Sequence, residues 1–198
     1  MLELQSITHR YGEKTVLQGL SHRFPESGAV LLTAPSGVGK TTLLRLIAGL
    51  EAPTEGTVHN SYSRVAMCFQ EPRLLPWLSC LDNVKLVLAN AENADETARL
   101  WLERMELSDV SDKLPETLSG GMRQRLSLAR ALAFGGDLLL LDEPFTALDE
   151  SLKCRIVPWI KAANPLGLTL IVSHNAADAT LLDATALTLV GCPAERLI

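Results

Sequence analysis

The fold of this chain is decided by Val30-Leu31-Leu32-Thr33-Ala34-Pro35-Ser36-Gly37-Val38-Gly39-Lys40-Thr41-Thr42. The apolar run at 30–33 is typical of a buried strand, and it ends in a turn rich in glycine. A helix is predicted from Lys40 to about Leu50, because leucine and isoleucine side chains recur there at helical spacing. A strand, a glycine-rich turn and a helix in this order form the repeating unit of an α/β protein.

This turn matches the P-loop pattern G-x-x-x-x-G-K-[ST], except that Ala34 replaces the first glycine. Gly37 and Gly39 let the backbone aim its N–H groups at a polyphosphate, and the helix N-terminus adds a favourable dipole. Lys40 is expected to reach the β- and γ-phosphates, and the Thr41 hydroxyl to bind Mg²⁺. Ala34 should keep its backbone out of positive φ. The expected nucleotide contacts are Ala34, Pro35, Ser36, Gly37, Val38, Gly39, Lys40, Thr41 and Thr42. The alternative is a plain strand-to-helix turn with an exposed lysine.

Size and composition indicate one folded domain. The chain has 198 residues, of which 47% are hydrophobic and 21% charged, which favours a globular protein over a disordered one. The formal net charge is −5, and no cluster of lysine and arginine is present that could follow a nucleic-acid backbone. We therefore expect no nucleic-acid partner.

The cysteines and the apolar runs bear on the compartment. The four cysteines, at 68, 80, 154 and 192, have wide and irregular spacings that match neither a zinc site nor a disulfide framework. Reduced thiols in a cytosolic protein are the better interpretation. The start lacks the pattern of a signal peptide, and no run approaches the ~20 apolar residues that span a bilayer. If the protein serves a membrane, we expect it on the cytosolic side.

The rest of the chain alternates between strand and helix patterns, with a helical stretch inserted. Strands are predicted at 2–8, 14–24, 65–69, 138–141, 168–172 and 186–190, and helices at 122–133 and 150–163, with a short one before 186. Pro158 should kink or shorten its helix. Residues 72–118 have a helical texture, and Ser79 with Asp82 three positions later resembles a capped helix start. We therefore expect an α/β core at 1–71 and 119–198 and a helical subdomain at about 72–118.

An apolar strand delivers two acids at its carboxyl end. Asp142 and Glu143 follow Leu138–Leu141, and parallel sheets place their ligands at this edge. Asp142 fits an acid that holds Mg²⁺ through water, and Glu143 is placed to act as general base toward an attacking water. A solvated turn after a core strand is the alternative.

A third motif, Ser119-Gly120-Gly121, opens a helix whose N-terminus can face an anion. On its own such a string is more often an ordinary helix cap than a ligand site. Placed after the P-loop and immediately upstream of the two acids, it resembles the signature motif of ABC ATPases. The resemblance implies a P-loop NTPase core of the ABC ATPase type, with a small antiparallel β-subdomain and an inserted helical subdomain.

Further positions match the motifs of that family. Tyr11 matches the aromatic residue on which adenine stacks, and Gln70 matches the glutamine that meets Mg²⁺ and the attacking water. Ala147-Leu148-Asp149 matches the loop that crosses the dimer interface, and His174 matches the switch histidine at the γ-phosphate. Each also has a plain alternative: packing, a solvated strand end, a helix cap, and a structural histidine.

The resemblance implies a mechanism and partners. Two ATPase subunits, identical or paired, would bind head to tail, with each ATP between one P-loop and the partner subunit's Ser119 and Gly121. Hydrolysis by Glu143, with His174 and Gln70, would release the halves. The motion would pass to transmembrane permease subunits, and indirectly to a solute-binding protein. The expected cofactors are ATP and Mg²⁺, and the expected place is the cytoplasmic face of the cell membrane.

The stretch Gln70–Ser79 resembles the importers of nitrate, sulfonate and taurine, although other chains would select the solute. Its apolar run of Leu74, Leu75, Trp77 and Leu78 is predicted to be exposed and to receive a permease helix, or else to be core of the helical subdomain. An exporter subunit, a non-transport ABC ATPase of DNA repair or the ribosome, and a regulatory module without turnover are the other readings. Glu143 argues against the last of these.

Overall fold

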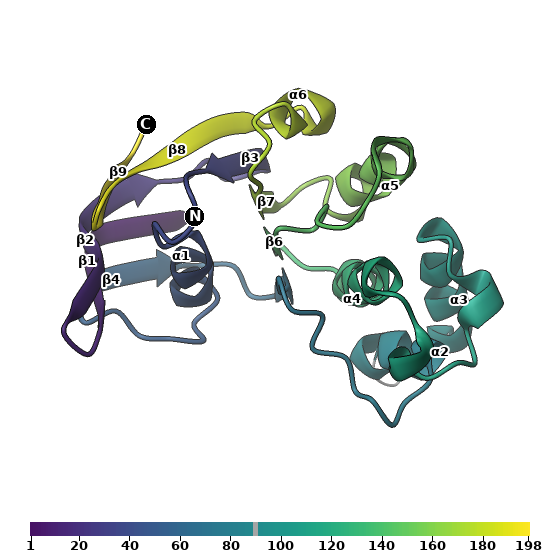
Figure 1. Ribbon diagram of the computed structural model, residues 1–198. Coiled ribbons are helices and arrows are strands. Elements are labelled where there is room, and N and C mark those ends of the chain that lie inside the picture. Colours follow the sequence, from purple (N-terminus) through teal and green to yellow (C-terminus); the bar gives the residue numbers. More distant parts are fainter. Residues whose placement is uncertain (89–90) are drawn as a thin grey trace.

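The computed structural model describes residues 1–88 and 91–198, and its centre is one nine-stranded sheet with the order β4-β1-β2-β9-β8-β3-β7-β6-β5. Figure 1 shows this sheet curling around helix α1 on one side, while the remaining long helices lie on the other. The strands are β1 (Leu2–Tyr11), β2 (Lys14–Arg23), β3 (Gly28–Thr33), β4 (Glu55–Asn60), β5 (Val65–Cys68), β6 (Leu138–Asp142), β7 (Leu168–Val172), β8 (Thr185–Gly191) and β9 (Ala194–Leu197).

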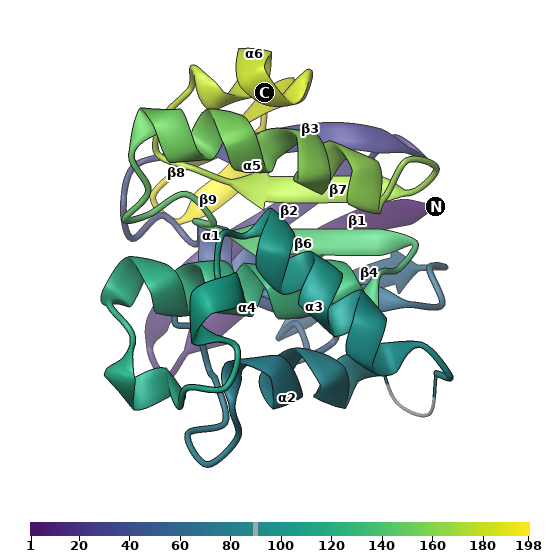
Figure 2. The same ribbon diagram turned by 90° about the vertical axis from the view of Figure 1, so that its right-hand side faces the viewer.

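Five neighbouring strands, β8, β3, β7, β6 and β5, are parallel. Every residue of β6 and of β7 is buried, which is expected where helices cover both faces of a parallel sheet. On one face α1 (Lys40–Ile47) packs through Leu43, Leu44 and Ile47. On the other face lie α4 (Gly120–Phe134) and α5 (Glu150–Ala163), which Figure 2 shows in front of β6 and β7. This arrangement aligns the carboxyl ends of β3, β6 and β7 along one edge.

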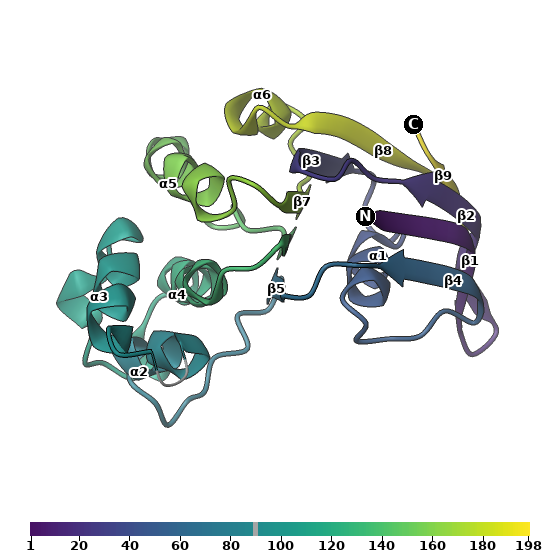
Figure 3. The same ribbon diagram turned by 180° about the vertical axis from the view of Figure 1, so that it is seen from behind.

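The other end of the sheet is largely antiparallel. β1 pairs with β2 and with β4, and β8 pairs with β9, all antiparallel. Figure 3 shows these strands folding over α1 from the side opposite to the helical part. The apolar side chains of this end, among them Leu4, Ile7, Leu17 and Leu20, close the core around α1.

The segment between β5 and α4 is helical throughout its regular elements. It holds α2 (Cys80–Lys85), η1 (Leu86–Leu88), α3 (Ala94–Arg104), η2 (Ser108–Val110) and η3 (Pro115–Thr117). The expected cap at Ser79 is present, since its Oγ accepts the N–H of Asp82 at 3.0 Å. Ala98, Trp101 and Leu102 face the core from α3, as their spacing predicts. Within the described ranges, no helix is long and apolar enough to cross a membrane.

The structure corrects several expectations. The first helix ends at Ile47 rather than near Leu50, because Gly49 follows with a positive φ of 72°. Pro158 does not shorten its helix, which extends from Glu150 to Ala163 with the proline inside it. The sequence did not predict the strands β4 and β9. It predicted a short helix before residue 186 without bounds, and this helix is α6 (Asp178–Leu182). The division into core and helical subdomain stays a prediction.

Candidate functional site

The turn between β3 and α1 has the backbone that its glycines predict. Gly37 and Gly39 have φ values of 80° and 116°, and Ala34 is not among the residues with positive φ. Gly39 also has no room for a side chain, because a Cβ atom there would lie 2.7 Å from Cγ1 of Val16 on β2. The glycine is thus required both by φ and by the close approach of β2.

Lys40 begins α1 and folds back over this turn. Its Nζ donates hydrogen bonds to the backbone oxygens of Ala34 at 2.7 Å and Pro35 at 3.2 Å. Burial lowers the pKa of Lys40, while the charges of Glu143 and Asp142 raise it. The ammonium group therefore lies inside the turn, where a polyphosphate held by the backbone N–H groups would meet it.

The two acids lie at the end of β6. Asp142 is 1% exposed, and neither of its carboxylate oxygens has a hydrogen-bond partner among the residues that the structure describes. Burial raises the pKa of Asp142, and the nearby Thr41 hydroxyl and the charges of Arg45 and Lys40 partly offset this. A buried carboxylate with free lone pairs, next to a threonine hydroxyl, is an oxygen donor set that fits Mg²⁺. Within the described ranges no group of three or more His, Cys, Asp or Glu forms a metal cluster, so phosphate or water oxygens would have to complete such a site.

Glu143 adopts an unusual backbone conformation with φ of 52°, and its N–H donates to the carbonyl oxygen of Val172 on β7. Its Oε1 lies 2.8 Å from Nε2 of His174, which follows β7. Burial raises the pKa of Glu143, while His174 and Lys40 lower it. Glu143 and His174 are therefore a contacting pair that β6 and β7 bring together.

A cavity of about 420 Å³ joins these elements. It is lined by Tyr11, Lys14, Val16, Ser36, Gly37, Gly39, Lys40, Thr41, Thr42, Gln70, Glu143 and His174. Gln70, just beyond β5, thus faces the same space as Glu143 and His174. Ala34, Pro35, Val38 and Asp142 do not line it. Ala34 and Val38 pack against the core, and Asp142 is buried. The chain has brought residues from five separate segments to one hollow of a size that suits a nucleotide.

Two lining residues, Lys14 and Val16, were not anticipated. Both lie on β2 and point the same way, because alternate residues of a strand share one face. The i, i+2 spacing of these two residues puts them on one face of the strand, but the sequence does not show what that face packs against. Their place depends on the curl of the sheet, which brings β2 over the turn at Gly39.

Tyr11 lies at the end of β1 and is 46% exposed. Its hydroxyl donates to Oε2 of Glu51 at 2.5 Å, and the ring of His9 packs edge-on against it with centroids 4.8 Å apart. Glu51 also accepts a hydrogen bond from Arg45 on α1. The tyrosine is thus held by contacts with Glu51 and His9, and it lines the cavity.

Ser119, Gly120 and Gly121 do not line the cavity. Ser119 caps α4, since its Oγ accepts the N–H of Met122 at 3.2 Å, and both Ser119 and Gly120 are exposed. Gly121 packs against the backbone oxygen of Ala147, which would lie 2.9 Å from an added Cβ. Ala147 has a φ of 68°, and Asp149 caps α5 by accepting the N–H of Leu152. The segments 119–121 and 147–149 therefore form one exposed corner apart from the nucleotide-sized cavity.

Of the apolar run expected to be exposed, only Trp77 is fully so, at 71%. Leu74, Leu75 and Leu78 are half-buried, and Leu74 packs against the main core. Asn83 holds this loop, because it accepts the N–H of Leu75 and donates to the oxygens of Leu75 and Leu78. The run is therefore partly core and partly surface.

Comparison with known proteins gives consistent matches. The family model described as "ABC transporter" matches residues 17–146. An aliphatic sulfonates import ATP-binding protein of Burkholderia cenocepacia is 41% identical over 163 residues, which are 79% of this chain and 60% of that protein. A protein of the same description from Rhodococcus jostii is 41% identical over 196 residues, 95% of this chain and 78% of that one.

Solved structures agree with these matches. The dimeric structure of MJ0796, a bacterial ABC transporter cassette, has a TM-score of 0.85 at 29% identity, and covers 91% of each chain. A dimeric post-hydrolysis state of MJ0796 bound to ADP and Pi has a TM-score of 0.87 at 27% identity, and covers 98% of this chain and 96% of that one.

Proposed function

The chain belongs to the ABC transporter family, and from that premise we propose that it binds and hydrolyses ATP to energise a membrane transporter. The observation that carries the proposal is the cavity of about 420 Å³, in which a P-loop with its lysine faces Glu143, His174 and Gln70. An exporter subunit or a non-transport ABC ATPase would need the same groups, so the cavity supports ATP hydrolysis, and the importer relatives support the transport role. The aligned part spans 60% of the Burkholderia relative's length. The activity, substrate and partners of this chain are therefore proposals.

The residues of the cavity divide the chemistry between them. The backbone N–H groups at 36–41 and the Lys40 ammonium would hold the phosphates, and the ring of Tyr11 would stack on adenine. Glu143, as the carboxylate, would take a proton from the attacking water. His174 would donate to the γ-phosphate, and Gln70 would orient the water. These roles come from the resemblance, and the placement of the groups around one space supports them.

We also propose a Mg²⁺ site at this edge. Thr41 and Gln70 would contribute oxygen ligands, and Asp142 would act through water, which suits an ion that keeps part of its hydration shell. When bound, the ion would neutralise charge on the β- and γ-phosphates. The two unpartnered oxygens of the buried Asp142 support this proposal.

A second subunit is needed to complete the site. Ser119, Gly120 and Gly121 lie outside the cavity, so within one chain they do not contact a nucleotide held by Lys40. Two chains placed head to tail would bring the exposed N-terminus of α4 over the partner's nucleotide. The dimeric cassettes among the similar structures support this arrangement, with an identical or a paired ATPase subunit.

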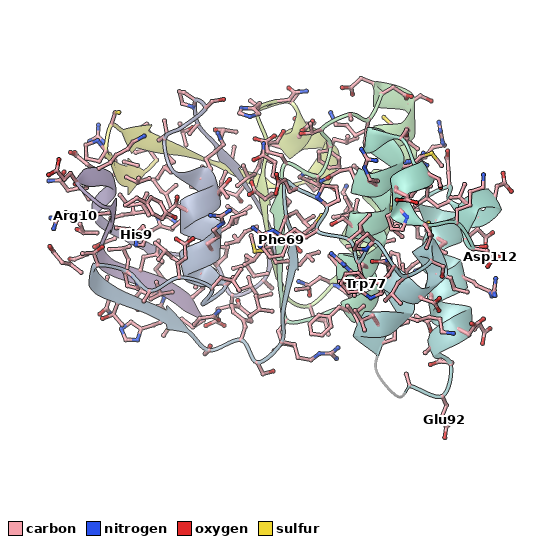
Figure 4. The ribbon with its side chains drawn as sticks, turned by 60° about the horizontal axis from the view of Figure 1, so that its bottom comes forward. His9, Arg10, Phe69, Trp77, Glu92 and Asp112 are labelled. Atoms are coloured by element: carbon pink, nitrogen blue, oxygen red, sulfur yellow. The ribbon has the colours of Figure 1, made fainter. Side chains whose placement is uncertain are left out.

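Permease subunits would bind beside the helical part of the molecule. A hollow of about 260 Å³ there is lined mostly by apolar side chains, including Leu50, Phe69 and Val87. Leu50 and Trp77 are 56% and 71% exposed. Figure 4 shows Phe69 near the middle of the molecule and Trp77 toward its helical end. We propose that a short cytoplasmic helix of the permease binds across this surface, which would place the chain at the cytoplasmic face of the membrane.

The names of the relatives favour an importer over an exporter. We propose a small sulfonate-like anion as the solute, delivered by a separate binding protein. The solute would bind to other chains, so the cavity residues would not select it.

Hydrolysis by the purified chain tests the central proposal. Phosphate release from ATP should depend on Mg²⁺ and rise more than linearly with protein concentration, because the active form is a dimer. His174→Ala should lose turnover. Release that is absent in the wild-type chain at every concentration and also with its permease would exclude the proposed function.

A further inference from the structure

Three polar side chains are buried outside the cavity, and no proposed role uses them. Ser173, Asp178 and Lys153 are 5%, 1% and 4% exposed. Ser173 directly follows β7, Asp178 begins α6, and Lys153 lies in the first turn of α5. Burying an ion pair carries a large desolvation cost, which close geometry must offset.

The three side chains form a continuous chain of contacts. Nζ of Lys153 lies 2.6 Å from Oδ1 of Asp178 and 3.1 Å from Oε1 of Glu150. The other carboxylate oxygen of Asp178 accepts a hydrogen bond from the Ser173 hydroxyl at 2.6 Å. The same hydroxyl oxygen accepts the N–H of Asn175 at 3.1 Å. Every link is short, so the Ser173 hydroxyl has little freedom.

These contacts end on both sides of His174. Ser173 precedes it and donates its N–H to the carbonyl oxygen of Leu32 on β3 at 3.3 Å. Asn175 follows it, bound to the Ser173 hydroxyl. The imidazole itself is half exposed, and its Nε2 lies 2.8 Å from Glu143. The position of such a side chain depends on its backbone, and the buried group contacts the residues on both sides of His174.

We propose that Ser173 and Asp178 are positioning residues for His174, held by Lys153 on α5. The proposal rests on the role assigned to His174 above. Asp178 fixes the hydroxyl of Ser173, the hydroxyl fixes the N–H of Asn175, and the peptide between them fixes the imidazole beside Glu143. Because Lys153 lies one turn beyond Asp149, the same contacts tie His174 to the helix that begins at the exposed corner 147–149. Figure 2 shows α6 next to α5 at this end of the molecule.

Ser173→Ala and Ser173→Thr form the matched test, because one removes the hydroxyl and the other keeps it. Ser173→Ala should lower kcat by roughly tenfold to a hundredfold, the scale expected when a reacting group is misplaced by about 1 Å. The KM for ATP and the affinity for ADP should change little, because the phosphate-binding turn is untouched. Ser173→Thr should restore turnover. A merely structural role would instead lower the melting temperature and the ADP affinity together.

The exposed pair Lys161–Asp183 joins the same two helical segments without reaching His174, and so provides the control. Lys161→Met should leave kcat unchanged. If Ser173→Ala does not fold, the double variant Lys153→Met with Asp178→Leu decides, because it removes both buried charges and the acceptor of Ser173. Lost turnover with retained ADP binding in that variant supports the inference. Full turnover in Ser173→Ala, or in the folded double variant, alongside lost turnover in His174→Ala overturns it and leaves the proposed function intact.

Discussion

Nε2 of His174 lies 2.8 Å from Oε1 of Glu143, although the two residues follow different strands. Glu143 follows β6 and His174 follows β7, and these strands are parallel neighbours with Asp142 opposite Val172. The contact therefore depends on the order of strands in the sheet. It also gives the pair a shared electrostatic environment, since each side chain faces the cavity that Lys40 lines.

Glu143→Gln should keep ATP affinity and lower turnover by about 10²- to 10⁴-fold, because the general base is lost while size and contacts are preserved. The variant should accumulate as an ATP-bound dimer in size-exclusion chromatography. Steady-state phosphate release checks the rate. Unchanged hydrolysis would refute the assignment of Glu143.

As the pH is lowered, turnover should begin to fall at a higher pH than it would if Glu143 had the pKa of an ordinary glutamate. Burial raises the pKa of Glu143 above its ordinary value of 4.5, and only the ionised form acts as a base. For the same reason the ionised side chain costs stability at neutral pH, and this cost disappears as the pH falls through the raised pKa toward 4.5.

Melting curves of the wild type and Glu143→Gln at a series of pH values show whether the ionised Glu143 side chain stabilises or destabilises the fold. The variant should melt at an equal or higher temperature at neutral pH, with the difference shrinking toward acid. A difference of the opposite sign would mean that the folded protein stabilises the charge.

Lys40→Ala should weaken ATP binding roughly tenfold to a hundredfold, the range expected for one lost hydrogen bond to a charged group. Ser119→Arg should leave nucleotide binding by the single subunit intact and block turnover, because Ser119 does not line the chain's own cavity. Titration with a fluorescent ATP analogue separates the two defects.

Mixing these two inactive variants tests the head-to-tail arrangement. A mixed dimer can assemble one site with an intact lysine and an intact serine. Partial recovery of turnover at intermediate ratios is expected, and the two variants unmixed are the controls. If one intact site is enough for turnover, the absence of recovery at every ratio counts against a site shared between two subunits.

Gly121→Ala should lower turnover strongly, whereas Gly120→Ala should be much better tolerated. A Cβ atom on Gly121 would lie 2.9 Å from the oxygen of Ala147, while one on Gly120 meets nothing within 4 Å. The first substitution has to push the start of α4 away from the loop 147–149, and the second does not. Equal loss in both variants would mean that flexibility, rather than this contact, matters.

Trp77→Glu should leave the subunit folded and able to bind ATP but reduce its co-purification with the permease subunits. The side chain is 71% exposed, so the charge enters solvent in the free subunit and would enter an apolar interface in the complex. Leu166→Glu is the matched control, since Leu166 is 90% exposed and lies beyond α5, away from the proposed interface. Undiminished co-purification of the Trp77 variant excludes this docking surface.

The sequence by itself was enough for the features that depend on local patterns. The strand, turn and helix around Lys40, the buried strands β6 and β7, and the cap at Ser79 follow from spacing, glycine and hydrophobicity within a few residues. β4 was missed because Val58 is the one apolar side chain among its six residues, Glu55–Asn60, so the sequence shows no apolar alternation there. The site residues named from their motifs remain predictions that the experiments above test.

Tertiary structure alone decided which of these residues meet. The contact of Glu143 with His174, the approach of Val16 to Gly39, and the buried pair Lys153–Asp178 each join segments distant in the chain. A hydrophobic pattern shows that a strand is buried, but it does not show which strand lies beside it. Strand order and the curl of the sheet determine those neighbours, because they arise from packing the whole chain around one core.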